Sequence, residues 1–444
     1  METPHPEGVA LEGVKAVRLQ YADLHGVSRG KDLPVGQLEA AAEDCVHFVA
    51  AIMTTDLAHN VVAGPETGFE DIAARPDLST LVRVPWDPTV AACIADLERV
   101  GTHEPYGVDS RGALKRVVAG YEELGLEPVV GPELEFYLCE PDEAARGGWR
   151  RYVGQDSNVY TVGHRADPRG VLGRMMHAAD EFGLEVLAAN HEYGRGQFEI
   201  NVAHGPAVAS ADRAFRLKWL VKEMAAMEGM LATFIGKPWN DDEGSGFHLH
   251  VSLRDGDGGN AFLDPEGQGG LADATRHFVA GVLDHAPGLM AFFNPTVNAY
   301  RRIKADALVP TRVCWGHDNR LTFVRVPRDR GRGTRVEVRV GDGSANPYLA
   351  YAAALAAGLD GIRRKLEPPA PLAGFIYDLP EEEIGPPVPR TLGDALAALE
   401  ADELLVDALG KELVDTFRMM KEYELGRFAD WTTDWELREY MHHL

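Results

Sequence analysis

Four short segments of the sequence alternate charged or polar side chains with apolar ones. They are Glu133-Leu134-Glu135-Phe136, Gln197-Phe198-Glu199-Ile200, His248-Leu249-His250-Val251 and Arg335-Val336-Glu337-Val338-Arg339. In a β-strand, residues i and i+2 point to the same face, so each segment would present its polar groups on one face. A single strand of this kind is typical of the wet face of a sheet. The four together, with carboxylates, imidazoles and guanidinium groups but no lysine, indicate a site for metal ions and phosphate.

The acids of these segments and Glu192, which precedes the second of them, have with one imidazole the chemistry of ligands for hard divalent cations. Oxygen-rich ligation with one histidine suits Mg²⁺ or Mn²⁺ rather than a metal that prefers thiolates. So many carboxylates in one place would be electrostatically costly without cations. The candidate metal ligands are Glu133, Glu135, Glu192, Glu199, His248 and Glu337.

A run of arginines follows in the sequence, and guanidinium groups bind carboxylate and phosphate in a bidentate manner. The chain has neither a GxxxxGK(S/T) nor a GxGxxG motif, so we expect phosphoryl transfer outside the P-loop and Rossmann classes. Taken alone, each arginine is more typical of a surface ion pair, and His250 of a hydrogen-bonded structural histidine. The ordered combination carries the prediction. The arginines are Arg302, Arg320, Arg325, Arg335 and Arg339.

Composition limits the class of protein. The 444 residues are 45% hydrophobic, enough for one large domain and a smaller one, or for three ordinary domains. A net charge of −25 argues against binding to nucleic acid or to an anionic membrane. The N-terminus lacks the pattern of a signal peptide, and no apolar run of about 18 residues predicts a membrane span. The four cysteines lie far apart without a CxxC motif, which favours reduced thiols and a cytoplasmic protein.

Periodicity predicts an α+β organisation. A small unit ending near Gly101 would contain strands within 13–22 and 91–98, a helix near 36–44 and a loop-rich stretch at 54–88. Further along, we expect a strand at 128–139, a hairpin turn at 256–259 and a helix at 110–124 with Ser110 as its N-cap. The other expected helices are 168–182, 210–231, 346–362 and several within 391–444.

These motifs, with others in the same order, resemble the type I glutamine synthetase superfamily over nearly the whole chain. Matching segments are Asp23-Leu-His-Gly, Arg29-Gly-Lys, Pro85-Trp86, Gly131-Pro-Glu-Leu-Glu-Phe-Tyr, Asn190-His-Glu-Tyr-Gly-Arg-Gly-Gln-Phe-Glu, Gly244-Ser-Gly-Phe-His-Leu-His-Val-Ser-Leu, Asn298-Ala-Tyr-Arg-Arg, Asp318-Asn-Arg, Arg325-Val-Pro, Arg335-Val-Glu-Val-Arg and Asn346-Pro-Tyr.

The resemblance implies a fold and an assembly. It implies an α+β protein with a β-grasp domain over 1–103 and a catalytic domain over 104–444, the latter an antiparallel, barrel-like sheet with helices. Members of the superfamily form double-ring dodecamers with active sites between neighbouring subunits. The apolar spacing of 435–444 is helical and needs a partner to cover it, and in the family such a tail inserts between the rings.

The resemblance also implies roles. ATP would phosphorylate the γ-carboxylate of L-glutamate, and an amine would then attack the acyl phosphate. Glu135, Glu192 and Glu199 resemble ligands of the metal nearer glutamate, and Glu133, His248 and Glu337 ligands of the metal on the ATP phosphates. Glutamate would contact Gly244, Arg302 and Arg339, with Glu135 and Glu192 nearby. The nucleotide and phosphates would contact His250, Ser252, Arg320, Arg325 and Arg335.

The departures from a true glutamine synthetase lie on the amine side. Ammonia-using members carry a glutamate two residues before a proline in the loop after the Tyr-Lys-Arg motif, where this chain has Leu308. A second family acid, in Phe-Asp-Gly-Ser-Ser, is replaced or absent at 48–52. Ammonium needs fixed negative charge for capture and deprotonation. Loss of both acids resembles the glutamate–amine ligase branch, whose acceptors are polyamines, ethanolamine and related amines.

Three acids remain candidates for contacting an amine: Asp56, Asp306 and Glu243. The favoured interpretation is an ATP-dependent glutamate–amine ligase acting with Mg²⁺ or Mn²⁺. One alternative is glutamine synthetase itself, with Asp306 replacing the missing glutamate. Another is an inactive scaffold of the same fold, although all six expected metal ligands are present.

Overall fold

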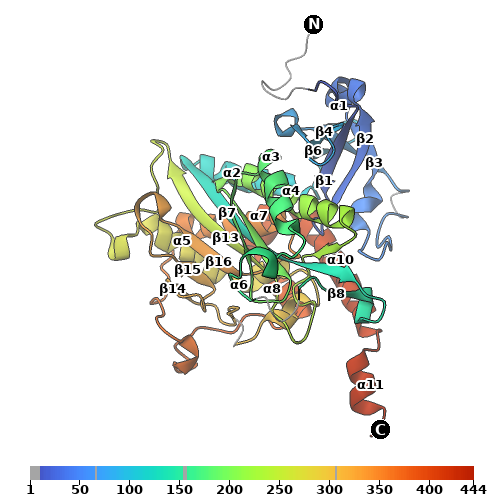
Figure 1. Cartoon of the computed structure of the whole chain (residues 1–444). Helices are drawn as coiled ribbons and strands as arrows, with labels where there is room; N and C mark the ends of the chain where they lie inside the picture. Colours follow the sequence, from blue (N-terminus) through green and yellow to red (C-terminus); the bar gives the residue numbers. More distant parts are fainter. Residues whose placement is uncertain (1–10, 66–67, 154–157, 306–307) are drawn as a thin grey trace.

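Alternating apolar residues build two separate β-sheets in the chain (Figure 1). The computed structural model describes residues 11–65, 68–153, 158–305 and 308–444. The first sheet has the order β2-β1-β6-β4-β3, with β5 paired to β6. Its strands are β1 (Ala16–Ala22), β2 (Ser28–Pro34), β3 (Val46–Val49), β4 (Asp71–Pro76), β5 (Val82–Arg83) and β6 (Val90–Arg99), with helix α1 (Leu38–Asp44) between β2 and β3.

The second sheet has ten strands and is organised around β7 (Leu126–Pro141). Its main path is β14-β15-β16-β13-β7-β10-β9, and β8, β11 and β12 also pair with β7. The other strands are β8 (Trp149–Arg151), β9 (Val186–His191), β10 (Gln197–Val202), β11 (Gly205–Pro206), β12 (Leu231–Thr233), β13 (Gly246–Asp255), β14 (Trp315–His317), β15 (Val324–Val326) and β16 (Val336–Asp342).

Helices pack against the apolar face of this sheet. The most buried is α7 (Pro347–Arg364), which contacts α2, α4, α5, α6 and α9. Its alanine-rich sequence permits this, because small side chains let neighbouring helices approach closely. The others are α2 (Ser110–Glu122), α3 (Val171–Glu181), α4 (Ala207–Met227), α5 (Asp273–Asp284), α6 (Ala286–Phe293), α8 (Leu392–Ala401), α9 (Glu403–Leu409), α10 (Lys411–Ala429) and α11 (Asp434–Tyr440).

An ion-pair network around the buried Arg111 joins the first sheet to helices that pack on the second. Arg111 of α2 donates to Asp77, which follows β4, at 2.9 Å and to Asp96 of β6 at 2.6 Å. It also donates to Asp212 of α4 at 2.8 Å, and Tyr348 of α7 donates to the same aspartate at 2.8 Å. Because removing one partner would leave the buried charge of Arg111 uncompensated, the network stabilises the packing of these helices against the first sheet.

The expected α+β organisation is confirmed, with local corrections. The N-cap of α2 is Asp109, whose carboxylate accepts from the backbone N–H of Arg111, and not Ser110, which is already helical. The loop-rich stretch 54–88 contains two short strands that the sequence did not predict. The turn at 256–259 does connect two paired segments, because Arg254 and Asn260 form an antiparallel bridge.

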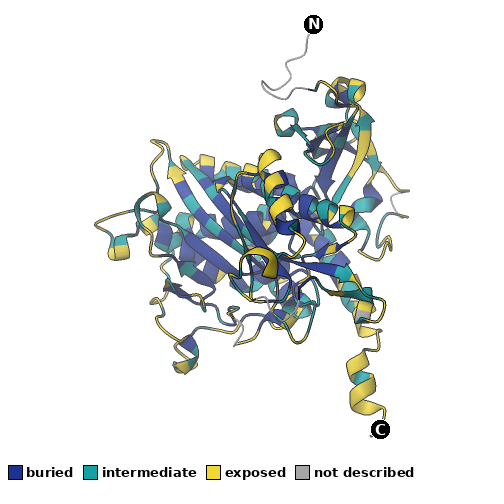
Figure 2. Ribbon diagram, viewed as in Figure 1, coloured by how far each residue is buried: buried dark blue, intermediate teal, exposed yellow. Residues whose placement is uncertain are grey.

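The C-terminal helix α11 extends away from the rest of the chain, and most of its surface is exposed (Figure 2). Trp431, Trp435 and Met441 are 73%, 60% and 66% exposed.

Within the described ranges, no helix has the length and hydropathy needed to cross a membrane.

Candidate active site

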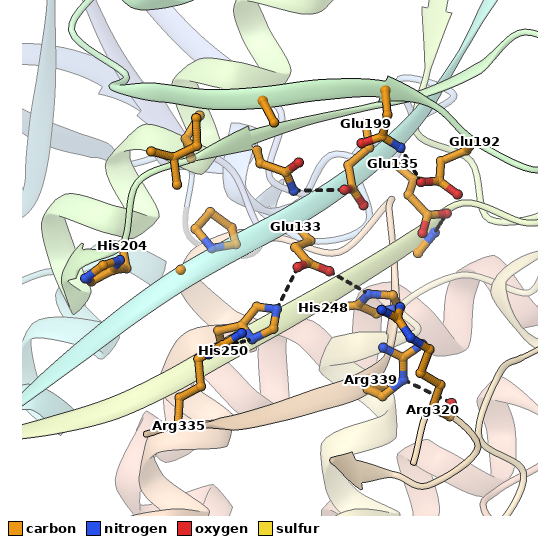
Figure 3. Close-up of a pocket in the computed structure, with 18 of the residues that line it drawn as sticks. Glu133, Glu135, Glu192, Glu199, His204, His248, His250, Arg320, Arg335 and Arg339 are labelled. Atoms are coloured by element: carbon orange, nitrogen blue, oxygen red, sulfur yellow. Dashed lines mark hydrogen bonds and ion pairs between the residues drawn. The ribbon is translucent and has the colours of Figure 1, made fainter. Parts of the chain in front are cut away.

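A cavity of about 990 Å³ opens on the polar face of the ten-stranded sheet. The alternation predicted from the sequence holds on all four central strands. The polar members of the four segments line the cavity (Figure 3), except Glu337, which is fully buried beneath the cavity surface. The apolar members are all fully buried, and of these only Val251 also contributes to the cavity lining; they are Leu134, Phe136, Phe198, Ile200, Leu249, Val251, Val336 and Val338.

Strand pairing sets the register of the charged groups. Glu135 of β7 is directly opposite Glu199 of β10, and Glu133 is opposite His248 of β13. His250 is in turn opposite Glu337 of β16. Because directly opposed side chains are about 4.5–5.5 Å apart at Cβ, groups from four strands converge.

Two histidines hydrogen bond to Glu133. Its carboxylate lies 3.2 Å from Nδ1 of His248 and 2.7 Å from Nε2 of His250. Burial opposes ionisation, but these contacts hold the pKa of Glu133 well below its usual range. Donor atoms of Glu133, His250 and Glu337 lie within 4.8 Å of one another, close enough to share one metal ion. The expected ligand His248 is nearby, 3.8 Å from Glu337.

Three carboxylates on the other side of Glu133 lack this compensation. Burial, followed by the charge of Glu192, raises the pKa of Glu135 to about 7. Burial also raises the pKa of Glu192 and that of Glu199, and neighbouring glutamates raise the latter further. Closely spaced buried acids resist ionising together. This donor set therefore fits a divalent cation, which would replace the protons and remove the repulsion.

Glu337 is fully buried and ion-paired with two arginines. Arg325 donates to it at 2.7 Å, and Arg339 donates to its other oxygen. Burial is outweighed by the Arg339 charge, and the pKa of Glu337 falls to about 2. Arg325 also donates to Asp318 at 2.6 Å and is not among the residues that line the cavity. Arg325 therefore contacts Glu337 from the side away from the cavity and holds its carboxylate in place.

The residues expected to hold glutamate lie together. Nε2 of Gln197 donates to Glu135 at 2.8 Å and to the carbonyl oxygen of Gly244 at 3.0 Å. Arg302 is 3% exposed, donates to the carbonyl of Val340 at 2.9 Å, and has an Nε with no hydrogen-bond partner among the described residues. Arg339 also lines the cavity and is 4% exposed. These cations can bind a carboxylate ligand.

A second group of expected residues lies toward the other end of β13. Arg335 lies 3.1 Å from Nδ1 of His250, and Ser252 donates to the carbonyl of Thr334. Both Arg335 and Ser252 line the cavity, as does Arg320. Arg332, Gly333 and Thr334 continue this wall, so backbone and cationic groups are available for a polyphosphate.

Of the residues expected to face the amine, Leu308 and Glu243 line the cavity, together with Val309. Leu308 is 45% exposed and has a φ of 52°. Asp306 lies outside the described residues. The segment 48–52 does not contribute to this cavity within the single chain; Phe48 instead packs on Tyr21 with ring centroids 5.0 Å apart.

Sequence reasoning missed several lining residues. Gln197 was expected on the polar face but was given no role, and Asn201, at i+2 from Glu199, could have been placed on the same face by strand alternation. Tyr160, Leu187 and His204 also line the cavity, but they lie outside the alternating motifs and no local pattern marks them.

Comparisons with known proteins agree on one family. The model described as "Glutamine synthetase, catalytic domain" matches residues 107–440. A protein named glutamine synthetase from Methanococcus maripaludis is 35% identical over 443 residues, covering 98% of each chain. Another with this name from Thermus thermophilus is 35% identical over 441 residues, covering 97% of this chain and 96% of the relative.

Solved structures give the same result. One named "Apo GmaS without ligand" superposes with a TM-score of 0.86 at 33% identity and covers 97% of both chains. One named "Crystal structure of novel glutamine synthase homolog" has a TM-score of 0.83 at 28% identity and covers 100% of both.

Proposed function

This chain belongs to the glutamine synthetase family, and we propose that within it the protein is an ATP-dependent glutamate–amine ligase. It would join the γ-carboxylate of L-glutamate to an organic amine, such as a polyamine, ethanolamine or another alkylamine, through γ-glutamyl phosphate. The observation that carries the proposal is an apolar acceptor wall, Leu308 and Val309, in the cavity that holds the carboxylate cluster.

The carboxylates support two proposed metal positions. Glu135, Glu192 and Glu199 would hold one Mg²⁺ or Mn²⁺ ion, and Glu133, His248 and Glu337 a second, with His250 close to the latter. When bound, such cations supply electrostatic stabilisation to a transferring phosphoryl group. The raised pKa of Glu135, caused first by burial and then by the charge of Glu192, supports this proposal, because a bound cation would favour the ionised carboxylate.

Cationic side chains would bind and orient the substrates. Arg302 and Arg339, with the backbone of Gly244, are in position to hold the glutamate carboxylates. Glutamate would thus be fixed beside the carboxylate cluster, which lowers the entropic cost of reaction. His250, Ser252, Arg320 and Arg335 would contact ATP. Arg325 would act through Glu337, to which it is hydrogen bonded, rather than by touching the phosphates directly.

The acceptor distinguishes this proposal from its main alternative. Glutamine synthetase would need fixed negative charge near the reacting amine, and position 308 supplies an apolar side chain instead. The relatives named glutamine synthetase, at 35% identity, favour ammonia, whereas the apolar wall favours an amine with a carbon chain. An inactive scaffold is disfavoured, because the cavity retains the charged groups that phosphoryl transfer requires.

Glutamate-dependent ADP release decides between these functions. We expect faster release with at least one organic amine than with ammonium at equal free-base concentration, in the presence of ATP and Mg²⁺. Comparable or faster turnover with ammonium would assign the protein to glutamine synthetase. No glutamate-dependent release with any amine would support the scaffold.

A further inference from the structure

Of the three acids considered for amine contact, the structure leaves one available. Asp56 is 4% exposed and engaged with the backbone N–H groups of Ala58 and Asn60 and the side chain of Arg427. It does not line the cavity, and Asp306 lies outside the described residues. Glu243 lines the cavity and is exposed.

The backbone that carries Glu243 is held firmly. The preceding residue, Asp242, pairs with Arg151 at 2.7 Å and Arg195 at 2.9 Å. The carbonyl of Glu243 itself accepts from the hydroxyl of Tyr137 at 2.8 Å. Binding at a side chain on such a loop costs little ordering entropy.

The carboxylate of Glu243, by contrast, has no hydrogen bond or ion pair within the described parts of the chain. Burial lowers the pKa of Lys237, and the negative charge of Glu243 opposes this shift, so the two side chains are near each other. Nζ of Lys237 nevertheless donates to the carbonyl of Asp242 and forms no ion pair with Glu243 within 4.0 Å. An anion at the rim of the cavity is thus free to bind a cation.

The backbone next to Glu243 is also linked to Glu135 of the carboxylate cluster through one hydrogen-bonded side chain, Gln197. The next residue, Gly244, accepts from Gln197, and the same Nε2 donates to Glu135. Leu308 and Val309 line the same cavity. One cavity is therefore lined by buried carboxylates, by apolar side chains and by the exposed carboxylate of Glu243. This combination matches a molecule with two amino groups joined by methylenes.

We propose that Glu243 binds the distal ammonium group of a short diamine acceptor, whose other amino group attacks the γ-glutamyl phosphate. This inference rests on the proposed function and narrows its acceptor class. In the reaction, the neutral proximal amine forms the amide C–N bond as the C–O bond to phosphate breaks, and inorganic phosphate leaves. The proton lost from the nitrogen passes to solvent or phosphate, and the distal amine stays protonated.

The test compares 1,4-diaminobutane with n-butylamine, which has the same carbon chain but one amino group. We expect wild-type kcat/KM to favour the diamine by about tenfold, equivalent to about 1.4 kcal/mol. In Glu243→Gln this preference should fall to near one, mainly through a higher KM for the diamine, and Glu243→Asp should retain part of it. The control Glu383→Gln changes an exposed glutamate away from the cavity and should keep the full preference.

Two results would overturn the inference while leaving the proposed function intact: equal use of both amines by wild type, or an equal loss for both amines in Glu243→Gln. A wild-type enzyme that uses ammonium better than either amine would instead overturn the proposed function. A retained thermal midpoint in the Gln variant separates loss of binding from loss of folding.

Discussion

Leu308→Glu restores a carboxylate to the acceptor wall and should make ammonium a better substrate. Leu308 lines the cavity and is 45% exposed, so a glutamate there can reach the acceptor without being buried. Its φ of 52° is equally demanding for leucine and glutamate, so the substitution adds no backbone strain.

The size of the effect follows from distance and screening. Two unit charges at about 4 Å attract by about 1 kcal/mol in water and about 4 kcal/mol at an effective dielectric constant of about 20. A position that is half exposed belongs near the lower end, at about 1–2 kcal/mol. This corresponds to a roughly five- to thirtyfold gain in kcat/KM for ammonium. Alkylamines should lose affinity, because each methylene no longer buried against leucine forfeits up to about 0.8 kcal/mol.

The assay is ADP release with glutamate, ATP and Mg²⁺, with ammonium and n-butylamine as alternative acceptors. Leu308→Gln is the matched control, because it has the size and polarity of glutamate without the charge. We expect the control to lose n-butylamine activity without gaining ammonium activity. If Leu308→Glu leaves ammonium kcat/KM unchanged, or if the Gln variant matches its gain, fixed charge at this position is not what limits ammonium use.

Three further predictions concern stability and assembly. Glu337→Gln should lower the free energy of unfolding by about 3–5 kcal/mol, because Arg325 and Arg339 lose their buried partner; unchanged urea unfolding would contradict this. His285 hydrogen bonds to two aspartates at 2.8 and 3.1 Å, and these contacts outweigh the effect of burial and raise its pKa. The protonated His285 therefore stabilises the folded protein fully below about pH 6.5, and its contribution to the free energy of unfolding is lost as pH rises through the folded-state pKa. Thermal unfolding of His285→Gln should therefore show a larger loss relative to wild type at pH 6 than at pH 8.5, and an equal loss at both would refute the ionic contribution. We expect the chain to form oligomers through the apolar side chains exposed near its C-terminus. Removing 431–444 should then lower the mass measured by light scattering, and an unchanged mass would contradict this expectation.

The polar face of the large sheet could be predicted from the sequence, because strand alternation is local. Glu133 and Glu135 must share a face once β7 forms, and the same holds for His248 and His250 on β13. Which strands are neighbours is a long-range property. The combined chemistry of the four segments predicted that they share one site, and the resemblance to a known family supported this, but periodicity alone could not show which strands pair.

What could not be predicted depends on tertiary contacts. Arg325 follows the alternation of its neighbours, yet its partners Glu337 and Asp318 draw it behind the cavity wall. Asp109 rather than Ser110 caps α2 because the chain enters the helix one residue earlier. Short strands such as β5, with two residues, carry too little pattern to be recognised.

The position of β7 has a consequence for how this enzyme can change over evolution. Glu133 and Glu135 are on β7, which pairs with five other strands, so a shift of one would disturb the other and the sheet with it. Leu308 and Glu243, by contrast, lie on connecting segments outside the strands. If Leu308 and Glu243 contact the acceptor as proposed, substitutions at these loop positions can change acceptor preference without disturbing the strand that holds Glu133 and Glu135.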